Sequence, residues 1–466
     1  MENTPFIHTI KTPYGYYFYD INTNQIIQIN EQIFKYLNNT KLIINSDIKN
    51  KIKDLKNLGY LSNNRPVKMK HPENDFLEYH LNENLSQLIL QVTQNCNFRC
   101  LYCVYSTINF ETQRNHSIRK MELKTAIASI DFFAEHSKNQ KTVNLSFYGG
   151  EPLLEFKLIK ELVKYSKTIF EGKDINFSIT TNGSLFNDEI IKFLSENKFN
   201  LMVSIDGTPE IHNKSRKFAN TGEGTYSVIE KGLKKIKNLN PNFYKKIIFN
   251  VVIDPRNNYN ELLKFFNENE LFANSVIKNA IIDDKYTVEK ITLNEEYTIE
   301  YKVQKFKTIL SLLGRYSEKK ISTVSKINIY DEFNYFEKAL KSKKKLSYEM
   351  SHSGPCIPGQ TKLFITTNGD FIPCEKVDET SDAMCIGNIY DGFNYDKARK
   401  LLNIAQLTEK NCINCWAIRN CMICARYCDN NGELSSEIKT ANCKITKFTM
   451  EEYLKNYIML KELQNN

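Results

Sequence analysis

The sequence predicts an α/β protein built on a partial (β/α)6 TIM-like barrel, with a small N-terminal module and a cysteine-rich C-terminal domain. Six short apolar segments alternate with amphipathic segments between about residues 85 and 285. Residues 16–29 have the pattern of a β-hairpin, and nine of the twelve cysteines lie between Cys356 and Cys443. A chain of 466 residues also exceeds the length at which one hydrophobic core stops growing, so two or three domains are expected.

Residues 1–75 form the first predicted domain, a winged-helix-like module followed by a linker. In YGYYFYDINTNQIIQI, two alternating apolar runs flank the turn-forming residues 22–24, which predicts a β-hairpin. Amphipathic segments at 31–37 and 47–61 predict two helices. The polar stretch SNNRPVKMKHPEND then suits a linker.

Residues 76–285 form the second predicted domain, the partial barrel. Its strand candidates are residues 85–93, 142–150, 176–183, 200–207, 246–254 and 276–283. Six units over about 200 residues give about 33 residues per unit, close to the ~31 of an eight-unit barrel. Parallel strands joined by right-handed helical crossovers are therefore expected. Six units predict an open, incomplete barrel.

The rest of the chain divides into a helical bridging segment, residues 286–350, and a cysteine-rich domain, residues 351–466. Apolar residues recur at helical spacing in the bridge, at Val303, Phe306, Leu310 and Leu313. The bridge is assigned no chemistry, and its lysine run at 341–345 is expected to be solvated. A helix near residues 449–463 is predicted to close the chain.

Composition predicts a cytoplasmic protein that uses its cysteines as metal ligands. No run of about 18 apolar residues predicts a membrane span, and the first residues lack the pattern of a signal peptide. Cytoplasmic thiols are kept reduced, so twelve closely spaced cysteines indicate metal sites in preference to disulfides. The net charge of +9 is spread over many lysine-rich faces, which favours a solvated surface over binding of nucleic acid or an acidic peptide.

Cys96, Cys100 and Cys103 form a C-x3-C-x2-C triad directly after the first strand candidate, where barrel enzymes place catalytic groups. Three thiolates can hold three irons of a 4Fe–4S cube, and the open fourth iron indicates catalysis instead of structure. The alternative is a structural zinc loop or a ferredoxin-like site. Either would need a fourth ligand close by, and none occurs between Cys103 and His116.

This triad resembles the signature of the radical S-adenosylmethionine superfamily, in which an aromatic residue, here Tyr102, precedes the last cysteine. Gly149-Gly150-Glu151, after the second strand candidate, is similar to the family's glycine-glycine-glutamate segment. Two glycines allow close approach of the backbone, and polar groups there can accept the ammonium of the cofactor. The resemblance implies that the cluster cleaves S-adenosylmethionine and starts radical chemistry.

Two later strand candidates end in Thr181-Asn182-Gly183 and Ser204-Ile205-Asp206-Gly207, and His212 and Arg216 follow soon after. In the family, such positions contact the ribose and carboxylate of S-adenosylmethionine. Ser204 is at a position that contacts S-adenosylmethionine in the family, and Arg216 could hold the cofactor's carboxylate with its two-pronged guanidinium. The alternative for Arg216 is a surface residue at the start of a helix. His212 is expected to orient the local backbone instead of transferring protons.

The second cysteine region resembles the SPASM extension, which carries two auxiliary 4Fe–4S clusters in known members. The family pattern implies that one cluster is held by Cys412, Cys415, Cys421 and Cys443. It implies that Cys356, Cys374 and one cysteine of the pair Cys424 and Cys428 hold the other. The spacing between Cys421 and Cys424 departs from the usual pattern, so the pair stays open and Cys385 is unassigned. If only three cysteines bind the second cluster, its open iron could hold a substrate thiolate. Zinc is the alternative metal for paired C-x2-C units.

The segment from Cys415 to Cys424 looks like maturases of cysteine-rich ribosomal peptides, and the N-terminal module is similar to modules that bind leader peptides. The resemblance therefore implies a peptide maturase that forms a thioether crosslink in a ribosomal precursor peptide. The leader would add a strand to the hairpin edge. An electron donor such as ferredoxin or flavodoxin would reduce the enzyme.

Two other functions remain open at this point. A sulfatase-maturase-like enzyme would oxidise one residue of a protein substrate and would need no leader-binding module. A non-catalytic metal protein would instead bind DNA through its winged helix, with steep salt dependence.

Overall fold

The computed structural model describes residues 4–103, 116–282, 291–342 and 345–465. An eight-stranded sheet forms its largest part, with the strand order β10-β9-β8-β7-β6-β5-β12-β13. The first six strands in this order pair in parallel. They are β5 (Gln87–Thr93), β6 (Thr142–Gly149), β7 (Asp174–Thr181), β8 (Asn200–Ser204), β9 (Ile248–Ile253) and β10 (Val276–Ile281). All six predicted strands of the open barrel are confirmed.

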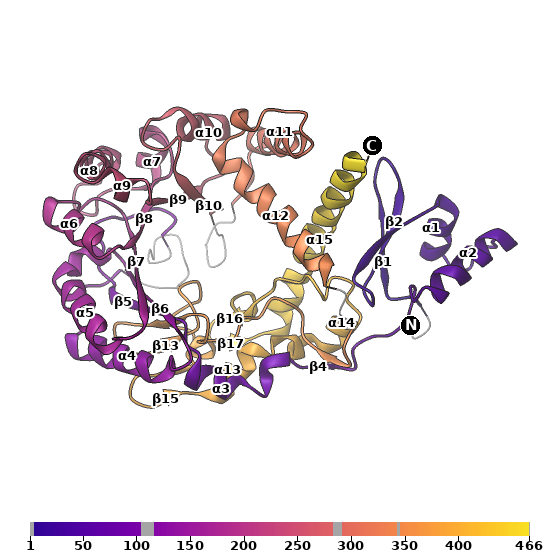
Figure 1. Cartoon of the computed structure of the whole chain (residues 1–466), viewed down its shortest axis with the longest axis horizontal. Helices are drawn as coiled ribbons and strands as arrows, with labels where there is room; N and C mark the ends of the chain where they lie inside the picture. The colour runs from indigo at the N-terminus through magenta and orange to yellow at the C-terminus, as the bar shows by residue number, and fades with distance from the viewer. Residues whose placement is uncertain (1–3, 104–115, 283–290, 343–344, 466) are drawn as a thin grey trace.

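Helices cover the outer face of this curved sheet (Figure 1). They are α4 (Leu123–His136), α5 (Phe156–Ile169), α6 (Asp188–Glu196), α7 (Pro209–Ser215), α8 (Tyr226–Leu239), α9 (Pro241–Tyr244) and α10 (Tyr259–Glu268). Their apolar faces and the buried strand residues form the main hydrophobic core. Within the described ranges, no helix combines the length and the apolar composition needed to cross a membrane.

The cysteine-rich region contributes two strands to the barrel sheet, which the sequence did not predict. The strand β12 (Leu363–Ile365) pairs in parallel with β5, and β13 (Phe371–Ile372) pairs antiparallel with β12. Strands of three and two residues are too short to show a periodic pattern. The edge of the barrel next to β5 is therefore covered by the C-terminal region.

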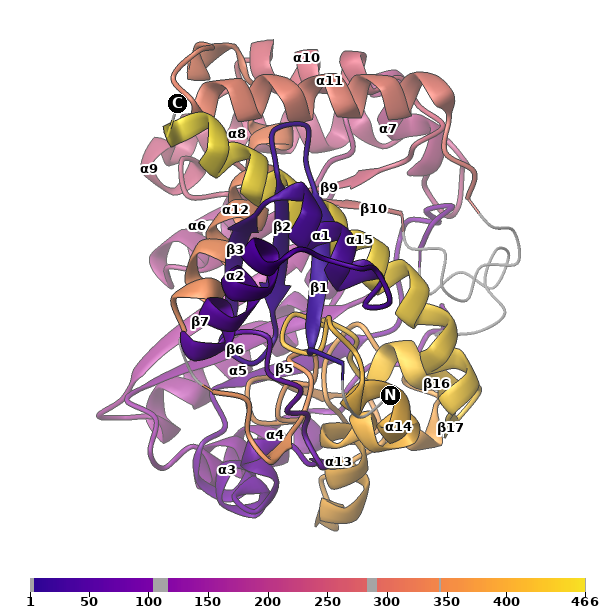
Figure 2. The ribbon, with the colours of Figure 1, turned by 90° about the vertical axis from the view of Figure 1, so that its right-hand side faces the viewer.

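Residues 4–62, called here the N-terminal module, contain a three-stranded antiparallel sheet of β1 (Ile7–Lys11), β2 (Tyr16–Asp20) and β3 (Gln25–Ile29). The predicted hairpin is β2 with β3. Two helices, α1 (Glu31–Asn38) and α2 (Ser46–Asn57), cover one face of the sheet (Figure 2). The second helix ends before residue 61, because Gly59 has φ of +90° and the amides of Gly59 and Tyr60 bond to the carbonyls of Lys56 and Leu55.

The remaining elements join these parts. The strand β4 (Lys68–Met69) pairs with β11 (Glu349–Met350), and α3 (Leu77–Glu83) leads into β5. The bridging segment contains the helices α11 (Glu295–Leu312) and α12 (Thr323–Lys341). The cysteine-rich region adds α13 (Tyr395–Leu402), α14 (Glu409–Ile413), the short pairs β14 (Gly387–Asn388) with β15 (Gly392–Phe393) and β16 (Asp429–Asn430) with β17 (Glu433–Leu434), and α15 (Ser436–Asn465).

The C-terminal helix α15 begins at Ser436, well before the predicted residue 449. Its first turns read SEIKTANCK, a polar sequence with too few apolar residues to show a helical repeat. The hydroxyl of Ser435 accepts a hydrogen bond from the amide of Ile438 at 3.2 Å and begins the helix. Cys443 is therefore held on a helix.

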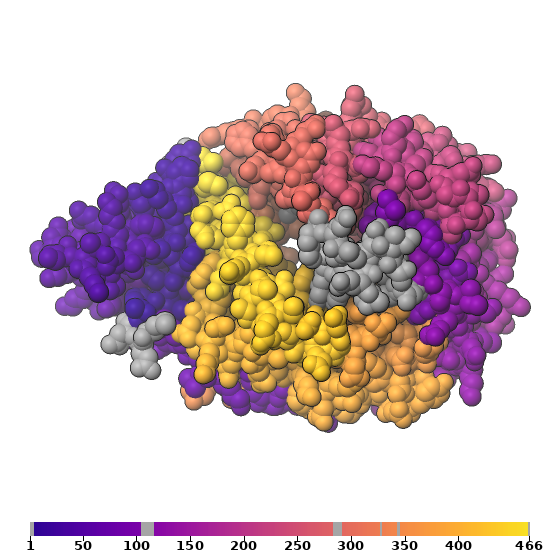
Figure 3. All heavy atoms as spheres, turned by 180° about the vertical axis from the view of Figure 1, so that it is seen from behind, coloured from indigo at the N-terminus to yellow at the C-terminus, as the bar shows by residue number. Residues whose placement is uncertain are grey.

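The N-terminal module packs against the cysteine-rich region, as the view from behind shows (Figure 3). The indole of Trp416 stacks on the imidazole of His8, with ring centres 3.8 Å apart. The guanidinium of Arg419 donates to the carbonyls of Ile21 and Asn22 at 2.6 and 3.3 Å. Both contact residues lie in the segment from Cys415 to Cys421, so this short turn forms part of the docking surface for the module, together with α12 and α15.

Candidate active site and cysteine clusters

The triad loop follows β5 and is held by backbone hydrogen bonds to the chain after α7. The amides of Arg99 and Leu101 donate to the carbonyls of Lys217 and Ser215, and the amide of Ala219 donates to Asn97, at 2.8–3.0 Å. The loop that carries Cys96, Cys100 and Cys103 is therefore positioned by the fold itself.

All twelve cysteines are free thiols, and those of the triad lie in a dry environment. Cys96 and Cys100 are each 9% exposed, and Cys103 is half-buried. Burial raises the pKa of Cys100 to about 12 and raises the pKa of Cys96 further. A buried thiol becomes a thiolate when a metal ion supplies the compensating charge.

This donor set fits a 4Fe–4S cluster. Three thiols on one loop match three irons and leave the fourth without a protein ligand. In the described part of the chain, no three Cys, His, Asp or Glu side chains converge on the space of a single metal ion. The thiolates of a cube bind different irons, so their sulfurs surround the cluster instead of meeting at one point.

The glycine pair packs β6 against the backbone that leads into the triad. A Cβ on Gly149 would lie 2.1 Å from the carbonyl oxygen of Thr93, and one on Gly150 would lie 2.2 Å from that of Asn95. The amides of Gly150 and Glu151 donate to these same two carbonyls at 2.9 Å. The glycines are therefore needed to hold the start of the triad loop.

Glu151 is completely buried, and both of its carboxylate oxygens accept hydrogen bonds from the chain. Oε1 accepts from the hydroxyl of Thr181 at 2.7 Å and from the amide of Leu153 at 3.0 Å, and Oε2 accepts from the amide of Asn182 at 2.7 Å. Burial raises the pKa of Glu151, and these donors oppose that shift. The side chain thus ties the end of β6 to the end of β7.

Asn182 belongs to the strand-end segment Thr181-Asn182-Gly183, which the family resemblance placed near S-adenosylmethionine. Its amide nitrogen lies 3.8 Å from the sulfur of Cys96 and 2.8 Å from the side-chain oxygen of Asn97. Glu151 fixes the backbone of Asn182 and so orients this amide toward the triad. The sequence signal for Asn182 was its place at the end of the third strand candidate, and its contact with Cys96 is seen only in the structure.

A buried ion network lies behind the triad. Arg216 is 6% exposed and Asp206 is 2% exposed, with their charged groups 4.0 Å apart. The hydroxyl of Tyr102 donates to the carboxylate of Asp206 and accepts from the guanidinium of Arg216 at 2.9 Å. Arg216 is therefore no surface residue, and its charge lowers the pKa of Cys100, which burial raises.

His212 orients the backbone, as expected. It is fully buried, and burial lowers its pKa to about 2, so the imidazole is neutral. Its Nδ1 accepts from the amide of Asp206 at 3.3 Å, which leaves Nε2 to donate to the hydroxyl of Thr225 at 3.0 Å. Ser204 ends β8 nearby and is 8% exposed.

The cysteine-rich region brings two groups of thiols together. Burial, and then the nearby thiols of Cys412, Cys415 and Cys443, raise the pKa of Cys421 to about 12. In the second group, burial and then the neighbouring thiols of Cys374 and Cys424 raise the pKa of Cys356 to about 11. Both groups fit the thiolate ligands of iron-sulfur clusters.

Two cysteines make other contacts. The thiol of Cys428 is fully buried among Ile404, Cys421 and Ile423, and it lies 3.7 Å from the carbonyl of Cys424. The thiol of Cys385 lies 3.4 Å from the carbonyl of Gly387. Of the two cysteines that spacing left open, Cys424 is the one close to Cys356 and Cys374.

Comparisons with known proteins identify one domain of this chain and several similar proteins. Residues 90–268 match the model of the Radical SAM superfamily. An uncharacterised protein of Methanocaldococcus jannaschii is 28% identical over 66% of this chain and 90% of its own length. A cysteine-type anaerobic sulfatase-maturating enzyme of Clostridium perfringens is 25% identical over 76% of this chain and 91% of its own length.

A solved structure shares the fold. The structure of native anSMEcpe with AdoMet and the Kp18Cys peptide superposes with a TM-score of 0.57 at 20% identity, over 82% of this chain and 99% of that one. The cysteines of the C-terminal region are suitable ligands for auxiliary 4Fe–4S clusters. Residues 90–268 are therefore a radical SAM domain, and the protein is an enzyme whose cofactors are S-adenosylmethionine and 4Fe–4S clusters.

Proposed function

We propose that this enzyme oxidises a cysteine-containing ribosomal precursor peptide and closes a thioether crosslink between a cysteine sulfur and a carbon of the same peptide. The grouping of Cys356, Cys374 and Cys424 is the observation that carries this proposal. Three thiolates on a 4Fe–4S cube leave one iron open, and a peptide thiolate is a natural fourth ligand. The radical SAM domain argues against the alternative of a non-catalytic DNA-binding protein.

In this proposal, Cys96, Cys100 and Cys103 would hold the first cluster, which with bound S-adenosylmethionine would supply a 5′-deoxyadenosyl radical. Gly149, Gly150 and Glu151 keep the triad loop in place through the contacts to Thr93, Asn95 and the end of β7. Tyr102, Arg216 and Ser204 would border the cofactor. The peptide then loses two hydrogen atoms, one to the radical and one as a proton and an electron. The electron needs an acceptor. An auxiliary cluster in the cysteine-rich region would be this acceptor.

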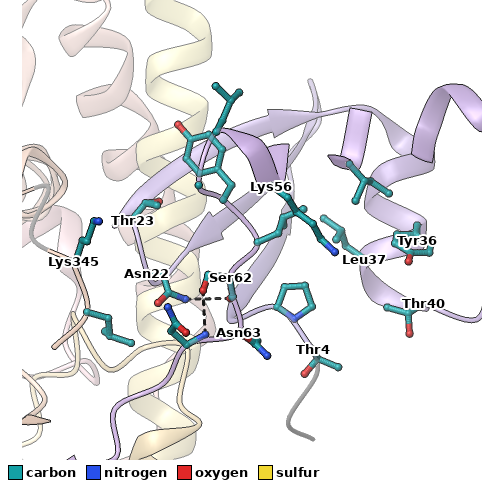
Figure 4. Close-up of a pocket in the computed structure, with 18 residues that line it drawn as sticks. Thr4, Asn22, Thr23, Tyr36, Leu37, Thr40, Lys56, Ser62, Asn63 and Lys345 are labelled. Atoms are coloured by element: carbon teal, nitrogen blue, oxygen red, sulfur yellow. Dashed lines mark hydrogen bonds between the residues drawn. The ribbon is translucent and has the colours of Figure 1, made fainter. Parts of the chain in front are cut away.

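The N-terminal module would bind the leader of the peptide through β3. In the three-stranded sheet, β3 is an edge strand, and the other edge, β1, lies against α15. Main-chain hydrogen bonds along β3 would recognise an extended leader with little dependence on its sequence. A pocket between the turn after β2 and the end of α2, lined by residues such as Asn22, Tyr36, Lys56 and Ser62, offers side-chain contacts in the same module (Figure 4).

Mass spectrometry tests the proposed reaction. The reduced, anaerobic enzyme is incubated with S-adenosylmethionine and a leader-bearing peptide that contains cysteines. We expect the peptide to lose two hydrogen atoms while 5′-deoxyadenosine forms, with fragmentation showing two joined residues. The matched peptide with serine in place of cysteine should remain unchanged. Formation of 5′-deoxyadenosine with an unaltered cysteine peptide would contradict the proposal.

Iron analysis tests the two open cysteines separately. Cys424→Ala should lower the iron and sulfide content by about four each per chain, because we propose Cys424 as a ligand of the second auxiliary cluster. Cys428→Ala, the matched control four residues away, should retain the iron of the unaltered enzyme. Equal losses in both variants, or a loss in Cys428→Ala alone, would show that this ligand assignment is wrong.

Oxidation of a single residue in a protein substrate is the second candidate function. The similarity to sulfatase-maturating enzymes over most of their length favours it. Fragmentation separates the two functions, since this candidate changes one residue and forms no crosslink. Deleting the N-terminal module would be a poor test, because the deletion would also strip Trp416 and Arg419 of their contacts.

A further inference from the structure

Lys439 is a buried lysine beside the cysteines of the first auxiliary group. Its side chain extends from the first turns of α15, and the residue is 1% exposed. Its ammonium nitrogen lies 3.3 Å from the sulfur of Cys412 and 2.7 Å from the hydroxyl oxygen of Thr408. Cys443 follows four residues later, so both residues lie on the same face of the helix.

The hydroxyl of Thr408 completes a second connection to the same sulfur. An ammonium group has only donors, so Thr408 accepts from Lys439 and keeps its own hydrogen free. That hydroxyl lies 3.4 Å from the sulfur of Cys412 and can donate to it. The sulfur of Cys412 thus receives one donor directly and a second through Thr408.

A buried ammonium needs a nearby negative charge. Among the described residues, the structure records no salt bridge between Lys439 and a carboxylate. The nearby His352 adds no charge, because burial and then the charge of Lys439 lower its pKa to about 3. Thiolates on the cluster can therefore supply the counter-charge, with the sulfur of Cys412 in direct contact with the ammonium and Cys443 also close to it.

We propose that Lys439, with Thr408, is a positioning residue that raises the reduction potential of the cluster held by Cys412, Cys415, Cys421 and Cys443. This inference rests on the proposed ligand set. Reduction adds one electron and one negative charge to the cluster. A buried positive charge and hydrogen bonds to a ligand sulfur stabilise that added charge, and both are known to set cluster potentials. This cluster would then accept an electron more readily than one with the same ligands and no lysine.

Redox titration followed by electron paramagnetic resonance tests the proposal on the full-length, reconstituted protein, with dithionite as the reductant. The signal of this cluster is the one lost in Cys443→Ala. In Lys439→Met, which keeps the length but removes the charge and the donors, we expect at least a tenfold drop in the equilibrium constant for reduction. For a one-electron couple this is a shift of about 59 mV to lower potential.

Lys447→Met is the matched control. Lys447 lies on the same helix, and its charge also lowers the pKa of Cys415 and Cys443, but its side chain is exposed to solvent. Solvent screens an exposed charge, so this variant should titrate close to the unaltered enzyme. Thr408→Val, which removes only the relayed donor, should shift the potential in the same direction by less than Lys439→Met.

The results of these titrations distinguish the proposed role of Lys439 from the alternatives. An unchanged or higher potential in Lys439→Met, or an equal shift in Lys447→Met, would overturn the proposal. Loss of the cluster's iron in Lys439→Met would still leave Thr408→Val to show the shift, and iron loss in both would mean that these residues hold the cluster instead of tuning it. The titration needs no peptide, so a failure of the proposed peptide reaction would leave this result standing.

Discussion

Replacing Cys96, Cys100 and Cys103 together by alanine is expected to abolish the formation of 5′-deoxyadenosine. The variant would lack every thiolate that we place on the cluster binding S-adenosylmethionine, so no electron would reach the cofactor. The loop should keep its conformation, because its hydrogen bonds to residues 215–219 are made by the backbone. Chromatography of the reduced enzyme with S-adenosylmethionine measures the product, and iron content should fall by about four per chain.

Cys385→Ala is the control for this loss. The thiol of Cys385 contacts the carbonyl of Gly387 and belongs to neither auxiliary group, so this variant should cleave S-adenosylmethionine at an unaltered rate. Circular dichroism should show the same helix content in both variants. If the triple variant still released 5′-deoxyadenosine above the enzyme-free background, the assignment of the triad would be wrong.

Replacing Arg216 by methionine is expected to lower the free energy of unfolding by about 3–5 kcal/mol, the typical cost of removing one partner from a buried ion pair. The carboxylate of Asp206, 2% exposed, would lose its positive neighbour, and the hydroxyl of Tyr102 would lose a donor. Burial already raises the pKa of Asp206, and removing Arg216 would raise it further. Denaturant unfolding of the anaerobic protein, followed by circular dichroism, measures the change.

A double variant distinguishes the loss of charge balance from the loss of packing. Asp206→Asn combined with Arg216→Met removes both charges, so it should be more stable than Arg216→Met alone. Lys160→Met, which breaks an exposed ion pair with Glu189, should cost less than about 1 kcal/mol. Strictly additive costs in the double variant would contradict the buried network.

The barrel strands could be predicted because each is an apolar run of five to eight residues bounded by turn-forming residues. The triad and the glycine pair were also visible, since both are local patterns in the sequence. The structural role of Glu151 could not be predicted from the sequence. Its hydrogen-bond partners, Thr181 and Asn182, lie one whole strand-helix unit away, and only the tertiary structure brings them together.

Burial was the other property that local patterns did not reveal. Arg216 and Lys439 are charged residues in polar stretches, where a solvent-exposed position is the usual outcome. Their burial depends on packing against Phe98 and Tyr102 in one case and on the start of α15 in the other. Similarly, spacing left Cys424 and Cys428 equivalent, and the short helical turn from Ala425 to Cys428 directs the second thiol into the core.

The turn from Cys415 to Cys421 contacts the N-terminal module and also carries proposed cluster ligands. These two roles limit how the N-terminal module can be exchanged between related proteins. Trp416 and Arg419 meet the N-terminal module, while the cysteines at both ends belong to one auxiliary group. A chimera cut at residue 75 would give this turn a foreign neighbour. Exchanging the module between relatives would therefore change the neighbours of this turn and of α12 and α15, so regions more than 300 residues apart in the sequence depend on each other.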